Sequence, residues 1–235
     1  MDKVNHMKRM LSCLTAAFVG LGAPLWAQSP VVVELFTSQG CSSCPPADAL
    51  LHELAERDDV IAIALHVDYW DYIGWKDEFA DPAYSKRQRN YASEGGRRSI
   101  YTPQMIVNGE TDIVGAKAMK LSAAISAHAA KPSAMVVTLT RDGDTVQIGA
   151  TTQAAGKYVV QMLRYQPFRE ARITRGENAG RTLAYANVAQ DWQVLGNWDG
   201  RSPLSLSANA AGTEPVVVLV QHAKHGPIVG AARLR

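Results

Sequence analysis

Two short apolar runs near the start of the chain have the pattern of strands that are buried on both faces. Residues 31–36 read VVVELF and residues 60–67 read VIAIALHV, so apolar β-formers follow one another without alternation, apart from Glu34. Between them, residues 47–56 carry apolar side chains at helical spacing. The order strand, helix, strand predicts a parallel strand pair joined by a crossover helix.

Helical and strand signals continue to alternate up to residue 130. Asp81-Pro82 combines a capping residue with a proline at the first helical position, which predicts the start of a second helix. Asn108-Gly109 predicts a tight hairpin turn. The remaining elements are expected as a helix end at 95–96, strands at 104–107 and 111–114, and an alanine-rich helix at 116–130. The expected order is therefore β-α-β-α-β-β-α.

After Pro132 the pattern changes to short β-rich runs with no helical period. Turn signals such as Asp142-Gly143-Asp144 separate these runs, and this arrangement favours an antiparallel sandwich or barrel. The runs lie at 135–140, 145–150, 158–164, 169–174, 182–188, 203–206, 216–221 and 228–232. We therefore predict an α/β domain at 28–131, followed by a separate all-β, antiparallel, sandwich-like domain at 132–235.

Residues 1–27 have the features of a cleaved signal peptide. A basic start is followed by an uncharged, largely apolar run at 11–23 and by a small residue, Ala27, before a plausible cleavage point. The apolar run is shorter than the ~20 residues that a spanning helix needs, and Pro24 follows it. We therefore expect a periplasmic or secreted protein without a stable membrane anchor.

Charge excludes one class of partner. Removal of residues 1–27 takes away three basic side chains and Asp2, which lowers the formal net charge from +2 to about zero. A basic nucleic-acid binder is thereby excluded. Export also implies an oxidising compartment, in which disulfides persist.

The candidate chemistry lies at the turn between the first strand and the first helix, where Cys41 and Cys44 form a C-x-x-C pair. In this context the pair is typical of a thiol–disulfide redox centre, because a helix N-terminus stabilises a thiolate. An inert structural disulfide is one alternative. Zinc would need further ligands such as His52 and His66, and a copper(I) site could combine the thiolates with His66. We expect no cofactor and no resident metal.

The motifs ELFTSQGCSSCPPAD and YTPQMIVNG, together with the order of elements, resemble the thioredoxin-like superfamily. More closely, they resemble a family of secreted bacterial thioredoxin-like proteins of unassigned function. The resemblance covers residues 31–130 and implies a thioredoxin fold for that part of the chain.

The resemblance also implies roles for individual residues. Cys41 would be the exposed nucleophile and Cys44 the resolving thiol. Thr102-Pro103 matches the position of a cis-proline that shapes the substrate groove. Glu34 would be a buried proton acceptor for the resolving thiol, although a carboxylate paired with a local cation explains it equally well. The double proline after Cys44 predicts that the regular helix begins near residue 46, away from Cys41.

These observations predict an exported thiol–disulfide oxidoreductase that acts on thiol or disulfide protein substrates together with an unidentified redox partner. The alternative is a non-catalytic thioredoxin-like binding module or a copper(I) carrier. In a polar cluster of His66, Asp68 and Asp71, metal ligation by His66 and Asp68 is a weaker candidate, and structural packing of this loop is the alternative. Residues 175–181 are interpreted as turn and core, and the β-rich half is expected to narrow access to Cys41.

Overall fold

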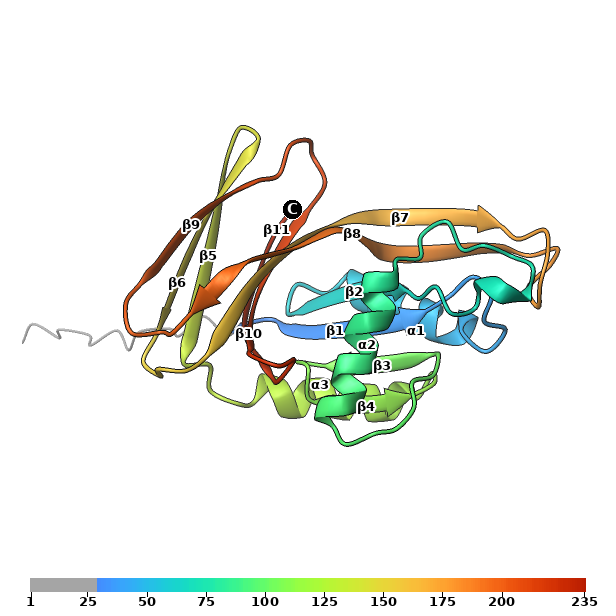
Figure 1. Cartoon of the computed structure of the whole chain (residues 1–235), viewed down its shortest axis with the longest axis horizontal. Helices are drawn as coiled ribbons and strands as arrows, with labels where there is room; N and C mark the ends of the chain where they lie inside the picture. Colours follow the sequence, from blue (N-terminus) through green and yellow to red (C-terminus); the bar gives the residue numbers. More distant parts are fainter. Residues whose placement is uncertain (1–28) are drawn as a thin grey trace, which may run out of the picture.

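The computed structural model describes residues 29–235, in which a mixed eight-stranded sheet and a three-stranded sheet dominate. The strand order in the large sheet is β11-β10-β7-β8-β2-β1-β3-β4, and β5-β6-β9 form the small sheet (Figure 1). The predicted signal peptide at 1–27 lies outside the described residues. Within residues 29–235, no helix has the length and apolar character needed to cross a membrane.

The first half contains the elements that the sequence predicts, in the predicted order. They are β1 (Val31–Thr37), α1 (Pro45–Ala55), β2 (Val60–His66), α2 (Pro82–Glu94), β3 (Gln104–Val107), β4 (Thr111–Val114) and α3 (Ala118–Ala129). A short 3-10 helix, η1 (Asp71–Ile73), which the sequence does not predict, lies between β2 and α2. Strands β1 and β2 are parallel, whereas β3 pairs with β1 in the antiparallel direction. All residues of β1 and β2 are buried, as their continuous apolar pattern predicts.

Helices cover both faces of the first four strands, and the side chains of β1 alternate between two cores. Val33 and Leu35 pack with apolar residues of α1 and α3, whereas Val32 and Phe36 belong to a second cluster that includes Tyr84 of α2. The period of two therefore assigns every β1 side chain to the α1 face or to the α2 face. Because Glu34 lies between Val32 and Phe36 with the same alternation, its side chain is on the α2 face.

The second half consists of strands and extends the sheet of the first half. Its strands are β5 (Met135–Asp142), β6 (Thr145–Thr152), β7 (Tyr158–Arg172), β8 (Thr182–Trp198), β9 (Leu204–Asn209), β10 (Val216–His222) and β11 (Ile228–Leu234). Two predicted runs merge into β7 across Pro167, and β8 continues well beyond the predicted run. Figure 1 shows β7 and β8 as a long hairpin that runs the length of the molecule.

The expectation of a separate sandwich is corrected by the position of β8, which pairs with β2 and joins the two halves into one sheet. Asn187 of β8 also donates from its side-chain amide to the carbonyl of Ala62 at 2.8 Å. One apolar cluster combines Val32 and Ile63 with Val217 and residues of β7 and β11. No break in the sheet or in the core therefore marks the predicted boundary near Lys131.

A sandwich-like arrangement does exist, but it shares its larger sheet with the first half. Met135 and Ile148 of the small sheet pack against Val160, Met162 and Val218 of β7 and β10. The opposite face of the same strands, through Leu163 and Val217, contributes to the core that contains α2. β7 and β10 are thus apolar on both faces because each face covers a different layer.

Candidate functional site

The two predicted cysteines form a disulfide in the turn between β1 and α1. The turn is closed by hydrogen bonds from the Cys41 backbone N–H to the Ser38 carbonyl at 3.1 Å, and from the Gly40 N–H to the Ser38 hydroxyl at 3.1 Å. A Cβ atom at Gly40 would lie only 3.0 Å from the Cβ of Trp70. Glycine at this position therefore lets the turn pack against the segment that follows β2.

Helix α1 begins at Pro45, directly after the disulfide, with Cys44 as its N-cap in helical geometry. The start lies within one residue of the predicted position near residue 46. A following proline disfavours helical geometry at Cys44, but the carbonyl of Cys44 accepts the N–H groups of Ala47 at 2.8 Å and Asp48 at 3.1 Å. These two bonds hold the disulfide at the positive end of the helix.

Both cysteines are inaccessible to solvent in this structure, since Cys41 and Cys44 each have 0% exposure. The implied exposure of Cys41 is therefore wrong for this conformation. The hydroxyl of Ser43 lies 3.4 Å from Cys41 Sγ and could donate to a thiolate formed there. One segment that contacts this buried turn is a loop contributed by the second half of the chain.

That loop comprises residues 173–181 and joins β7 to β8 at the end of the long hairpin (Figure 1). The side-chain amide of Asn178 donates to the carbonyls of Gln39 at 2.9 Å and Cys41 at 3.0 Å. A carboxylate oxygen of Glu177 accepts the Ser42 hydroxyl at 2.6 Å. Residues that the sequence indicates only as turn and core thus contact the CSSC segment, and nothing in their local pattern signals this.

Thr102 and Pro103 lie at the same end of the sheet as the disulfide. Gln104 pairs with Phe36, so the two preceding residues lie beside the end of β1, where the CSSC turn begins. The Thr102-Pro103 peptide bond is cis. The Thr102 hydroxyl accepts from the Trp70 indole N–H at 2.8 Å, which ties it to the segment that packs on Gly40.

Glu34 lies on the α2 face of β1 and is fully buried. One oxygen accepts from the Arg87 guanidinium at 2.6 Å, and the other accepts the Tyr91 hydroxyl at 2.6 Å. Arg87 also donates to Gln161 and Gln221 of β7 and β10. Of the two interpretations that the sequence allows, the structure favours the cation-paired carboxylate, because both oxygens of Glu34 are engaged by α2.

A different carboxylate, Asp48, is buried in the first turn of the helix that follows the disulfide, and the sequence prediction does not include it. It lies one helical turn after Cys44 in α1, is 5% exposed and accepts the Thr37 hydroxyl at 2.8 Å. Burial raises the pKa of Asp48 to about 7, although a nearby His66 and the Thr37 hydrogen bond lower it. The spacing of four residues from Cys44, on an otherwise apolar helix face, is the signal that could have found it.

His66 and Asp77 form a buried pair close to Asp48. His66 Nδ1 lies 2.7 Å from an Asp77 oxygen, and the same oxygen accepts the Gln39 backbone N–H at 2.8 Å. The imidazole packs edge-on against the rings of Phe79 and Tyr185. The Nε2 atom of His66 and the Tyr185 hydroxyl have no hydrogen-bond partner among the described residues.

The predicted metal-ligand sets do not come together. Asp68 accepts from the Ser85 hydroxyl and Asp71 from the Asp77 backbone N–H, whereas His66 pairs with Asp77. The ring of His52 lies against Phe168, away from the rings that surround His66. Residues 29–235 contain no group of three or more His, Cys, Asp or Glu side chains that could hold a metal ion.

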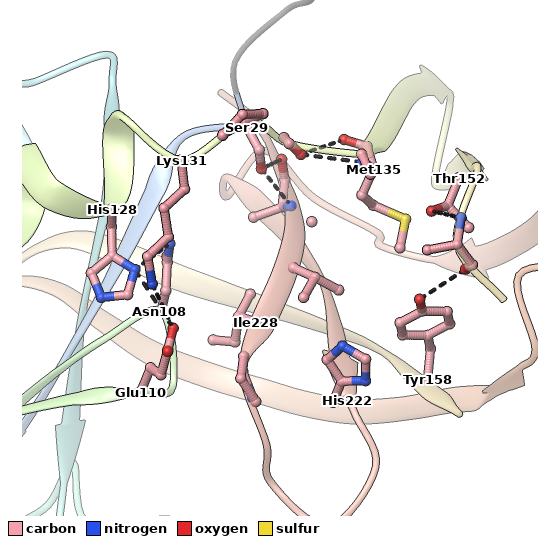
Figure 2. Close-up of a pocket in the computed structure, with 18 of the residues that line it drawn as sticks. Ser29, Asn108, Glu110, His128, Lys131, Met135, Thr152, Tyr158, His222 and Ile228 are labelled. Carbon is pink, nitrogen blue, oxygen red and sulfur yellow. Dashed lines mark hydrogen bonds and ion pairs between the residues drawn. The ribbon is translucent and has the colours of Figure 1, made fainter. Parts of the chain in front are cut away.

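A pocket of about 260 Å³ lies at the opposite end of β1, between α3, β5 and the β10–β11 hairpin. His128, Lys131 and Glu110 line it together with Tyr158 and apolar residues such as Ile228 (Figure 2). Two of its charged groups are paired with each other, since Lys131 Nζ lies 3.1 Å from a Glu110 oxygen. None of the predicted site residues lines this pocket.

Solved structures resemble the chain over most of its length. A protein of Agrobacterium tumefaciens, AGR_C_4864, is 33% identical with a TM-score of 0.75, and the match covers 87% of this chain and 93% of that one. HBP35 of Porphyromonas gingivalis shares the fold at 15% identity with a TM-score of 0.59, over 88% of this chain and 75% of that one. No curated protein matches the chain.

The family model described as a protein of unknown function, DUF1223, matches residues 32–221, a span that runs from β1 into β10. The match therefore includes the CSSC turn, the cis Thr102-Pro103 bond and the 173–181 loop. The chain belongs to the DUF1223 family.

Proposed function

We propose that the protein is an exported thiol–disulfide oxidoreductase whose redox centre is the Cys41–Cys44 disulfide. The observation that carries the proposal is a C-x-x-C disulfide at the N-terminus of α1, with a buried carboxyl, Asp48, one helical turn after Cys44. The helix N-terminus favours a thiolate, and Asp48 has a pKa of about 7. This combination provides both an electron-transfer pair and a group that can exchange a proton at neutral pH.

The fold supports a thioredoxin-like assignment of residues 31–129 as part of this proposal. The strand order β2-β1-β3-β4, with β1 and β2 parallel and helices on both faces, follows the order of elements that the resemblance implies. The cis Thr102-Pro103 bond lies beside the CSSC turn. The sequence of residues 1–27 supports export to the periplasm or beyond the cell.

In the direction that reduces a substrate, the Cys41 thiolate attacks one sulfur of a substrate disulfide and the other substrate sulfur leaves as a thiolate. Cys44 then transfers its proton to the Asp48 carboxylate, and its thiolate attacks Cys41 Sγ in the mixed disulfide. The second substrate sulfur leaves, and the Cys41–Cys44 bond forms. Two electrons pass to the substrate, and an external thiol partner must restore the reduced pair.

The assignment is tested with a protein disulfide as substrate and dithiothreitol as electron donor, at pH 7. We expect turnover by the wild-type protein above the rate of dithiothreitol alone, and none by Cys41→Ser or Cys44→Ser. Cys41→Ser should form no mixed disulfide, whereas Cys44→Ser should trap one with the substrate. Wild-type turnover no faster than that of Cys41→Ser would show that the disulfide is a structural element of a non-catalytic module.

A further inference from the structure

Within residues 29–235, every side-chain hydrogen bond between the second half of the chain and residues 39–44 comes from the 173–181 loop. Asn178 is 1% exposed and bonds the carbonyls of Gln39 and Cys41, whereas Glu177 is exposed and bonds Ser42 at the rim. The guanidinium of Arg181 donates to the Asn178 side-chain oxygen at 2.8 Å and so orients the amide. Asn178 is thus the central contact of the loop.

Apart from Asn178, the loop buries few of its side chains. Residues 174, 175, 177, 179 and 180 are exposed, and Gly176 is half-buried with a left-handed φ of 77°. Ile173, at the start of the loop, is buried in an apolar cluster with Leu183 and Tyr185, and a Cβ atom at Gly176 would lie 3.4 Å from the side chains of Ile73 and Trp75. Segments with few buried apolar contacts open at a lower free energy than the sheet that carries them. The loop can therefore open while β7 and β8 remain paired.

The burial of both cysteines is incompatible with exchange chemistry at Cys41 in this conformation. A thiolate must approach Cys41 Sγ in line with the S–S bond, displace Cys44 as a thiolate and form a mixed disulfide. Neither cysteine is accessible to solvent in this conformation. Reaction therefore requires that the segment covering the disulfide moves first.

We propose that the 173–181 loop is a gate over the disulfide and that a thiol reaches Cys41 only when the gate opens. The hydrogen bonds of the Asn178 side chain hold the gate closed. This inference specifies access to the site of the proposed function, but it holds for any reagent that reduces the disulfide. Glu177 contributes less than Asn178 because its bond to Ser42 is exposed to water. The gate belongs to the second half of the chain and the disulfide to the first.

The test is the rate at which dithiothreitol reduces the disulfide of the full-length protein under native conditions, followed by mass after alkylation. One thiolate of dithiothreitol opens the Cys41–Cys44 bond, and its second thiol closes the reagent to its cyclic disulfide. We expect Asn178→Ala to raise the second-order rate constant at least tenfold and Glu177→Gln to raise it two- to fivefold. Glu170→Gln, an exposed change on β7 in the same hairpin, is the matched control and should leave the rate unchanged.

A second measurement on the wild-type protein separates gate opening from unfolding. Local opening exposes little surface, so the reduction rate should be nearly constant in urea below the unfolding transition. A rate that rises with the full slope of global unfolding would overturn the gate, as would an Asn178→Ala rate within twofold of the wild type. If Asn178→Ala is reduced faster but neither protein turns over a protein disulfide, the gate stands and the proposed function fails.

Discussion

The Asp48 carboxyl should make the free energy of unfolding depend on pH, and Asp48→Asn should remove this contribution. Its pKa is raised from the ordinary value of 3.8 to about 7 because the side chain is buried. At about 1.4 kcal/mol per pKa unit, this difference corresponds to about 4 kcal/mol of folding free energy. The neutral amide in Asp48→Asn can still accept the Thr37 hydroxyl, so the substitution removes the titration and retains this contact.

The sign follows from the direction of the pKa change. The folded state retains a proton on Asp48 that the unfolded state releases above about pH 4. The contribution of Asp48 to stability is therefore complete below pH 4 and is lost as the pH rises through about 7. Relative to Asp48→Asn, the wild-type free energy of unfolding should fall by about 1.4 kcal/mol per pH unit over this window, to a total of about 4 kcal/mol.

The assay is urea unfolding followed by circular dichroism at pH values from 4.5 to 8, with the disulfide intact. Glu53→Gln on the exposed face of α1 is the matched control, and its stability should follow the wild type at every pH. A constant difference between wild type and Asp48→Asn across this range would refute the reasoning. It would mean that the carboxyl near Cys44 is ionised throughout and is no proton acceptor near neutral pH.

Three further predictions concern the buried ion pair, the shared core and the proton step. Glu34→Gln leaves the buried Arg87 charge uncompensated and should lower the free energy of unfolding by about 3–5 kcal/mol; a loss below 1 kcal/mol in urea unfolding would contradict the pairing. A fragment of residues 28–131 loses the strands that cover its α2 face, so it should lack the cooperative thermal transition of the full chain, and such a transition by circular dichroism would contradict a shared core. In Asp48→Asn, the rate at which Cys44 resolves a mixed disulfide should lose its inflection near pH 7 in stopped-flow measurements, and an unchanged pH profile would exclude Asp48 as the proton acceptor.

The sequence could predict the first half because its signals are local. Continuous apolar runs, the Asp81-Pro82 cap and the Asn108-Gly109 turn each specify an element within a few residues, and all three lie where they were expected. The pairing of β8 with β2 is not a local property. It depends on strands that are more than a hundred residues apart, so a change in pattern at Pro132 indicated a separate domain where the structure has one continuous sheet.

The difference between local signals and long-range contacts also explains which residues of the candidate site the sequence could predict. The spacing of Cys41 and Cys44 at a strand-to-helix turn was sufficient to predict where the disulfide lies. The pairing of Glu34 with Arg87 joins residues 53 positions apart, and the contact of Asn178 with Cys41 joins residues 137 positions apart. Neither contact produces a pattern of residue spacing that could be recognised in the sequence. Asp48 is the exception, because its position one turn after Cys44 is visible without the structure.

The most direct test of the proposed function is the redox equilibrium of Cys41–Cys44 in glutathione buffers, with the protein folded throughout. Thiol–disulfide oxidoreductases have potentials between about −120 and −270 mV, whereas structural disulfides lie below about −300 mV. We predict a reversible two-electron transition within the first range, measured by alkylation and mass. A disulfide that stays oxidised in every buffer down to about −300 mV would contradict the assignment and identify the pair as a structural crosslink.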